Sequence, residues 1–475
     1  MARVPLIGRL YYREYVAVIF GFVFIGFEAL LRFVIFFLPA PVIRWFHDQT
    51  RRLFIALVSG GSSIVPHPVS EEERRAAQIR VAVDFGELCA VHGYDWEEHV
   101  VQTKDGYLLG LHRIPCAKGA QLQQKKPIVY LHHGLLMCSD VFLCTTTAKR
   151  ALPLVLADAG YDVWLGNNRG NKYSRKHTTR HPHETAFWDF GIDEYAWHDI
   201  PDSIEYILQV TGEKSLSYVG FSQGTAQAFA ALSINPALNA KVDVFVALAP
   251  AMSPPGLSAP IVDGLMKASP ALMYLFFGRR SILSSTTMWQ SILYPPIFAS
   301  IIDGALSFLF AWSGAQISST QKAAAYAHLY SSASTKAVVH WFQIMRNAEF
   351  TMYDDDVQSL SPRAHGQGKG RFYYRPARFP TRNIAAPVVL LYGTRDSLVD
   401  IDVMLSQLPA RTVARPLVGY EHVDILWGDH IDRDVIPEVL AALKLHAREP
   451  SLPIAKHEKL RMRINGIGVN EEVQS

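Results

Sequence analysis

The sequence contains few cysteines and little net charge, and each shortage argues against a class of protein. Only four of the 475 residues are cysteine, and all four precede residue 145, so disulfides cannot hold the rest of the chain together. No Asn-x-Ser/Thr triplet occurs. The small number of cysteines and the absence of this glycosylation triplet both favour a reducing, cytosol-facing location. The 46 basic and 43 acidic side chains leave a net charge of +3, too weak a field to predict nucleic acid as a partner.

Apolar residues are abundant instead, at 49% of the chain. Three apolar runs, at 16–27, 33–43 and 53–58, lie within the first 66 residues, with Glu28 and Arg32 between the first two. Each of these charges would cost roughly 3 kcal/mol at the centre of a bilayer, so two short arms entering from one side are favoured over a straight crossing. We expect residues 1–66 to be a membrane anchor and not a cleavable signal peptide. A soluble helix packed on the core is the alternative.

The remaining sequence alternates short β-branched runs with helical stretches. This pattern predicts a mostly parallel central sheet with helices on both faces. The expected strands lie at 128–131, 161–165, 216–221, 242–248, 388–392 and 412–418. The expected units are a linker at 67–80, an α/β core at 81–251 and 381–448, a cap or lid inserted at 252–380, and a polar tail at 449–475.

The interval between the strands at 242–248 and 388–392 is too long for a loop, and we expect it to form a helical cap with an apolar inner face. Its apolar stretch at 292–312 could also be interpreted as a second membrane span. Pro295, Pro296 and Asp303 argue against that interpretation.

The pentapeptide Gly220-Phe-Ser-Gln-Gly224 follows an expected strand and opens an expected helix. A strand, a sharp turn and a helix are the setting of a nucleophile elbow, in which the turn projects a serine hydroxyl. A serine hydroxyl near neutral pH needs an imidazole to take its proton and a carboxylate to orient that imidazole. Ser222 is therefore the predicted nucleophile, and both partners are expected downstream.

Asp396 follows the expected strand at 388–392, and His422 follows the next apolar segment. The order serine, acid, histidine is that of α/β hydrolases, so these two residues are the predicted partners of Ser222. Asp400 and Asp402 remain alternative acids, and His430 remains an alternative base.

An anionic tetrahedral intermediate also needs two backbone N–H donors. The amide of Gln223, directly after the serine, is one candidate, and the amide of Leu135, after the strand at 128–131, is the other. His132 and His133 are expected to point to opposite faces of an extended segment, which would prevent them from binding one metal ion. No metal or cofactor is expected. The stretches 177–183 and 366–370 are interpreted as loops.

On these motifs the sequence resembles the acid-lipase family of α/β hydrolases, and within it the fungal membrane-anchored sterol esterases. The shared segments are 133–136 (HGLL), 160–174, 187–190, 220–224, 247–252, 340–346 and 421–424 (EHVD) for the family, and 130–140, 273–279 and 396–404 for that branch. The resemblance implies an α/β-hydrolase fold, catalytic roles for Ser222, Asp396 and His422, and hydrolysis of long-chain acyl esters. It also implies residence on lipid droplets or the endoplasmic reticulum membrane, facing the cytosol. Phe221 stands where secreted members have histidine, which puts an acidic pH optimum in doubt.

The sequence thus predicts a serine esterase that hydrolyses steryl esters at a membrane or lipid-droplet surface. A triacylglycerol lipase of broad range is the alternative within enzymes, and an acyltransferase using the same acyl-enzyme is another. A lipid-surface scaffold with a vestigial hydrolase fold is the alternative outside enzymes.

Overall fold

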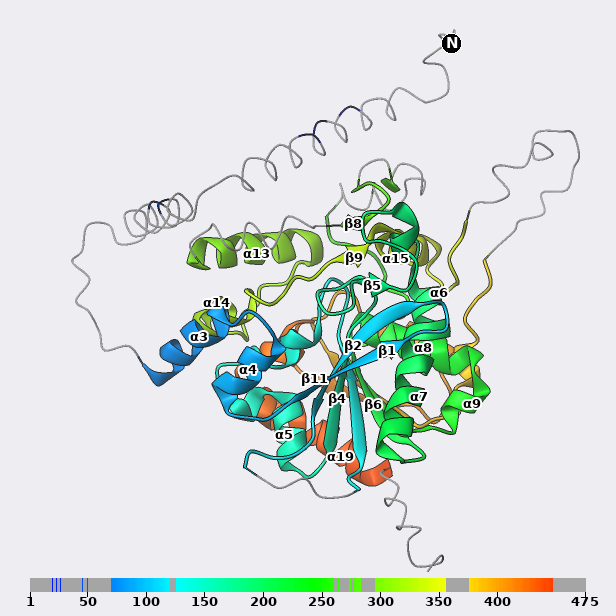
Figure 1. Ribbon diagram of the computed structural model, residues 1–475. Helices are drawn as coiled ribbons and strands as arrows, with labels where there is room; N and C mark the ends of the chain where they lie inside the picture. Colours follow the sequence, from blue (N-terminus) through cyan, green and yellow to red (C-terminus); the bar gives the residue numbers. More distant parts are fainter. Residues whose placement is uncertain are drawn as a thin grey trace, which may run out of the picture.

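The computed structural model describes residues 70–119, 125–259, 278–282, 295–355 and 376–446, together with residues 19, 23, 26, 45, 49, 264, 273, 274 and 277 singly. A large mixed sheet with helices on both faces dominates this part of the chain (Figure 1). The strands run in the order β1-β2-β4-β3-β6-β7-β10-β11, and β5 pairs with β2. Their bounds are β1 (Glu97–Gln102), β2 (Tyr107–Ile114), β3 (Ile128–His132), β4 (Asp162–Gly166), β5 (Lys176–His177), β6 (Leu216–Phe221), β7 (Val242–Leu248), β10 (Val388–Gly393) and β11 (Val413–Leu417).

Strands β4, β3, β6, β7, β10 and β11 pair in parallel, as the alternating pattern predicts. All six lie within one residue of the expected positions. The antiparallel strands β1 and β2, at the edge, were not among the expected strands. For β1 the reason is that its residues, Glu-Glu-His-Val-Val-Gln, are mostly polar, because most of this edge strand is not buried. The result is the mixed, mostly parallel sheet of an α/β-hydrolase fold.

Alternate residues of the buried strands enter two separate cores, because successive side chains of a strand point to opposite faces. In β3, Val129 and Leu131 join one core, and Ile128 and Tyr130 join the other. The helices on the first face are α4 (Phe85–His92), α5 (Leu152–Asp158) and α19 (Ile436–His446), and those on the second are α7 (Ile200–Thr211), α8 (Gln223–Ile234) and α9 (Pro236–Asn239).

Further elements lie above one end of the sheet in Figure 1. They are α13 (Pro295–Phe310), α14 (Ser319–Ala325), the hairpin of β8 (Ser281–Ile282) with β9 (Ala333–Ser334), and α15 (Thr335–Asn347). Asp303 of α13 accepts hydrogen bonds from Lys322 at 3.0 Å and from Tyr326 at 2.7 Å. The charge that argued against a second membrane span therefore ties α13 to its neighbour α14.

The segment before the core forms α3 (Glu71–Val81), which begins at Ser70 with a capping box. Ser70 Oγ accepts from the Glu73 amide, and the Glu73 carboxylate accepts from the Ser70 amide. Ala76 and Ile79 are buried, and α3 packs against α14. Residues 71–80 of the expected linker thus lie in a capped helix that contacts α14.

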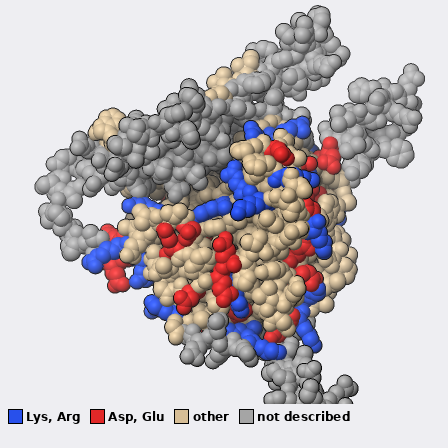
Figure 2. Space-filling view, viewed as in Figure 1, with Lys and Arg blue, Asp and Glu red and all other residues tan. Residues whose placement is uncertain are grey.

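The expected membrane anchor at 1–66, apart from its singly described residues, the loop at 366–370 and the tail at 449–475 lie outside the described residues. Among the helices that are described, none combines the length and the apolar character that crossing a bilayer demands. On the face drawn in Figure 2, the described basic and acidic side chains are interspersed. This mixture agrees with the small net charge of the sequence.

Candidate active site

The turn between β6 and α8 holds Ser222 in a strained backbone conformation, with φ 52° and ψ −120°. A non-glycine residue at positive φ costs about 1–3 kcal/mol, which the surrounding packing must offset. Gly224 makes this packing possible, since a Cβ there would lie 2.4 Å from the carbonyl oxygen of His132. A Cβ at Gly220 would lie 2.8 Å from the carbonyl carbon of Gly224. Both glycines of the motif are therefore required by close backbone approach.

The structure brings together three side chains that come from the carboxyl ends of three parallel strands. Ser222 follows β6, Asp396 follows β10, and His422 follows β11. His422 Nε2 lies 2.7 Å from Ser222 Oγ, and His422 Nδ1 lies 2.6 Å from Asp396 Oδ2. The other carboxylate oxygen of Asp396 accepts from the Leu398 amide at 3.0 Å. Because the aspartate holds Nδ1–H, Nε2 is free to accept the serine proton.

The alternative acids and base lie elsewhere. Asp400 accepts from the Val403 amide at 3.1 Å, which makes it the N-cap of α16 (Ile401–Gln407), and Asp402 is exposed on that helix. His430 is exposed at the start of α18 (Ile431–Asp434). The side chains hydrogen-bonded to Ser222 Oγ and to His422 Nδ1 are those of His422 and Asp396, the residues that the sequence favoured.

The two candidate oxyanion donors flank the serine. Gln223 is the first residue of α8, so its amide lies at the positive end of the helix dipole. A Cβ on Gly134 would lie 3.1 Å from Ser222 Cβ, so the segment that carries Leu135 touches the serine. Gln223 is held from above, because Trp341 of α15 donates its indole N–H to Gln223 Oε1 at 2.7 Å.

The prediction that His132 and His133 point to opposite faces is wrong. Their rings are stacked, with centroids 5.2 Å apart and planes 24° from parallel. The chain leaves the strand geometry after His132, the last residue of β3, so the alternation of an extended segment no longer applies. Both nitrogens of His133 are engaged in hydrogen bonds within the protein. In the described part of the chain, no group of three His, Cys, Asp or Glu side chains is placed to hold a metal ion.

Family comparisons agree with this geometry. A family model described as "Partial alpha/beta-hydrolase lipase region" matches residues 85–146, and one described as "alpha/beta hydrolase fold" matches residues 127–429. The second match spans β3, the elbow and the histidine loop. The chain belongs to the acid-lipase family of α/β hydrolases. It is a carboxylic ester hydrolase.

Relatives in this family match over most of their length. A "probable lipase" of Schizosaccharomyces pombe is 44% identical over 450 residues, covering 95% of this chain and 97% of the relative. The "Lysosomal acid lipase/cholesteryl ester hydrolase" of Rattus norvegicus is 32% identical over 364 residues, covering 74% of this chain and 89% of the relative. The "Gastric triacylglycerol lipase" of the same animal is 30% identical over 370 residues, covering 76% and 91%.

Two residues beside the histidine of this acid-lipase site were not predicted from the sequence. Trp312, at the end of the apolar stretch 292–312, stacks on His422. Glu421 is buried and accepts hydrogen bonds from the amides of Ser313 and Gly314, each at 2.8 Å, and from the Ser313 hydroxyl at 2.9 Å. The segment that follows α13 is therefore bound directly to the histidine loop. The only sequence signal was an acidic residue beside the predicted base.

Proposed function

We propose that this acid-lipase family member is a sterol esterase that works at a membrane or lipid-droplet surface facing the cytosol. The observation that carries the proposal is the hydrogen-bonded chain from Asp396 through His422 to Ser222, in which Asp396 and His422 are buried and Trp312 stacks on His422. The rat relative named as a cholesteryl ester hydrolase supports the substrate class. The motifs shared with the membrane-anchored sterol esterases support the same choice.

In this proposal, Ser222 Oγ attacks the acyl carbonyl carbon while His422 Nε2 takes the serine proton. The carbonyl oxygen becomes an anion held by the amides of Leu135 and Gln223. Collapse of this intermediate breaks the bond to the sterol oxygen, which leaves with the proton from His422. Asp396 stabilises the imidazolium that exists in between.

The acyl group is then bound to Ser222 as an ester. Water enters, gives a proton to His422 and attacks the same carbonyl carbon through a second tetrahedral anion. When that anion collapses, the fatty acid departs and the proton returns to Ser222 Oγ. The reaction consumes one steryl ester and one water, and it needs no cofactor.

The apolar runs within residues 1–66 fit a membrane anchor, because a steryl ester is nearly absent from water and the enzyme must lie where the substrate is. In this proposal the anchor retains the enzyme at the lipid surface and the catalytic domain faces the cytosol. Deletion of 1–66 should release the protein from membranes while it still cleaves a short, water-soluble ester. Loss of both properties together would contradict a separate anchoring role.

The direct test uses the full chain purified in detergent. Ser222→Ala should lower turnover of cholesteryl oleate by at least ~10⁴-fold and leave membrane binding unchanged. The wild type should react with an active-site fluorophosphonate at Ser222, and the variant should not. Retention of most activity by the variant would disprove the mechanism.

A triacylglycerol lipase is the second candidate, favoured by the relatives named as gastric triacylglycerol lipases. Hydrolysis of cholesteryl oleate and of triolein, presented in the same mixed micelles, separates the two. We expect a higher kcat/KM for the steryl ester. A higher kcat/KM for triolein would contradict the sterol esterase and favour the triacylglycerol lipase.

A further inference from the structure

His133 begins the loop that carries Leu135, two residues further on, and its hydrogen bonds determine which ring nitrogen carries the proton. The ring is buried, with 1% of the residue exposed. Its Nε2 accepts from the backbone amide of Asn168 at 3.2 Å and lies 3.1 Å from Asn171 Nδ2. Because a backbone amide can only donate, Nε2 carries no proton. The proton is therefore on Nδ1, which donates to the carbonyl oxygen of Gly134 at 2.8 Å.

This hydrogen bond orients the peptide group that contains the Leu135 amide. The carbonyl of Gly134 and the N–H of Leu135 belong to one planar trans peptide, so they point in opposite directions. With the carbonyl held towards His133, the N–H of Leu135 points away from it. No described group accepts a hydrogen bond from this amide. The same peptide approaches the serine, because Gly134 lies against Ser222 Cβ.

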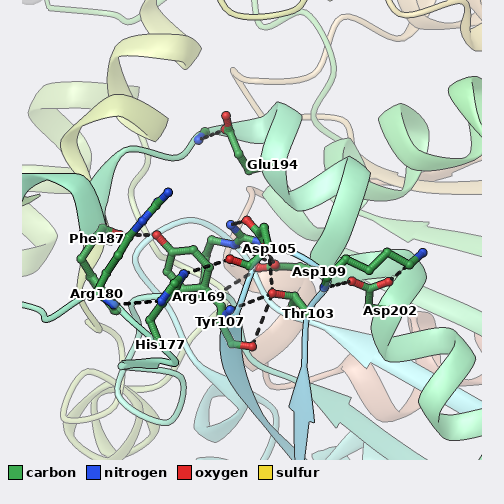
Figure 3. A network of polar contacts seen from close by, with 12 residues as sticks. Thr103, Asp105, Tyr107, Arg169, His177, Arg180, Phe187, Glu194, Asp199 and Asp202 are labelled. Carbon is green, nitrogen blue, oxygen red and sulfur yellow. Dashed lines mark hydrogen bonds and ion pairs between the residues drawn. The ribbon is translucent and has the colours of Figure 1, made fainter.

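The partners of His133 are themselves held rigidly. Asn168 and Asn171 lie in the loop after β4, and Arg169 between them is buried in an ion-pair network (Figure 3). The Arg169 guanidinium contacts Asp199 at 2.6 Å and Asp105 at 2.5 Å. Burial lowers the pKa of His133 to about 4. The imidazole is therefore neutral near pH 7 and keeps its single N–H for Gly134.

We propose that His133 is a positioning residue of the oxyanion hole, which aims the Leu135 amide by holding the Gly134 carbonyl. The inference rests on the proposed function, in which that amide binds the anionic oxygen. It gives a role to the second histidine of the His132-His133 pair and to the β4 loop, which contacts that histidine through the Asn168 backbone amide and the Asn171 side chain. Neither was assigned one from the sequence.

Two amide substitutions distinguish the hydrogen bond that His133 donates from the one that it accepts. His133→Asn places a side-chain N–H near the position of Nδ1, so it can still donate to Gly134. His133→Gln places its amide near the position of Nε2, so it can still accept from Asn168 but not hold the Gly134 carbonyl. His132→Phe is the matched control for His133→Phe, because both rings are buried to the same degree and Nδ1 of His132 has no partner among the described residues.

The measurements are kcat and KM on p-nitrophenyl butyrate, the inhibition constant of a trifluoromethyl ketone that forms a tetrahedral adduct, and the melting temperature. Losing an oxyanion donor outright costs about 10²–10³ in kcat, so misdirecting one should cost roughly 10- to 100-fold. His133→Gln and His133→Phe should lose this in kcat and in inhibitor affinity, with KM nearly unchanged. His133→Asn should retain most of the wild-type kcat and inhibitor affinity, even if its melting temperature is lower than those of the Gln and Phe variants.

The outcomes separate this inference from the proposed function. If wild-type Ser222 does not react with a fluorophosphonate, the proposed function and the role of His133 are both disproved. If Ser222 reacts, but the Asn and Gln variants show kcat values and inhibition constants within twofold of each other, the role of His133 is disproved and the proposed function is not. The same conclusion follows if activity tracks melting temperature across the Asn, Gln and Phe variants.

Discussion

The indole of Trp312 lies parallel to the imidazole of His422, with ring centroids 5.0 Å apart and planes 5° from parallel. Trp312 is buried, and the ring of Phe310 also stacks on it, with centroids 4.3 Å apart. Phe310 is the last residue of α13 and Trp312 follows two residues later, whereas His422 follows β11. The ring that is hydrogen-bonded to Ser222 Oγ is thus packed against a segment from above the sheet. Its orientation depends on that segment as well as on Asp396.

Replacing Trp312 should therefore disturb catalysis. We expect Trp312→Leu to lower kcat on p-nitrophenyl butyrate about 10-fold, because a small displacement of a catalytic group is costly. Trp312→Phe keeps an aromatic face and should stay within about threefold of wild type. Trp197→Leu, at a tryptophan that is 45% exposed, is the control. A wild-type kcat in Trp312→Leu would remove the proposed packing role.

The hydrogen bonds of Glu421 should stabilise the same arrangement. Glu421→Gln keeps the size of the side chain but loses the charge that strengthens the bonds from Ser313 and Gly314. We expect the free energy of unfolding to fall by about 1–2 kcal/mol and kcat to fall several-fold. Denaturant unfolding and steady-state kinetics check both. Glu438→Gln, at a half-exposed side chain, should change neither, and an equal effect there would contradict a specific role.

Asp424 predicts a pH-dependent difference in stability. Burial raises the pKa of Asp424 to about 6, against the hydrogen bond that the carboxylate accepts from the Glu421 amide. A carboxyl whose folded pKa exceeds its unfolded value near 4 destabilises the fold as pH rises from about 4 through about 6. Asp424→Asn cannot ionise. Its melting temperature relative to wild type should therefore increase over this interval, and a constant difference between the two proteins would contradict the shift.

The glycines offer a matched test of close packing. In Gly224→Ala, the new Cβ would lie 2.4 Å from a backbone oxygen, so we expect a loss of about 2–3 kcal/mol or more in the free energy of unfolding. In Gly304→Ala, within α13, nothing lies within 4 Å of the new Cβ. The helix propensity of alanine should then stabilise that helix by up to about 1 kcal/mol. Thermal unfolding compares the two, and equal effects would refute the argument.

How far the sequence could predict the site depended on whether the signal was local. The elbow was predictable because a strand, a turn glycine pattern and a helix are encoded within a few neighbouring residues. Asp396 and His422 were predictable because the carboxyl ends of parallel strands meet at one edge of a sheet. The separation of Ser313 from Glu421 is 108 residues, and no local pattern indicates that they touch.

The amino-acid sequence by itself determined the buried parallel strands, the nucleophile turn and the order of the predicted triad, since apolar periodicity and glycine placement act over short distances. Only the tertiary structure decided that the rings of His132 and His133 stack, that His133 donates to the Gly134 carbonyl, and that Trp312 covers His422. Such contacts depend on which side chains of distant segments meet once the sheet and the region above it have packed. That choice belongs to the whole fold, because each contact is stabilised by burial that no single segment provides.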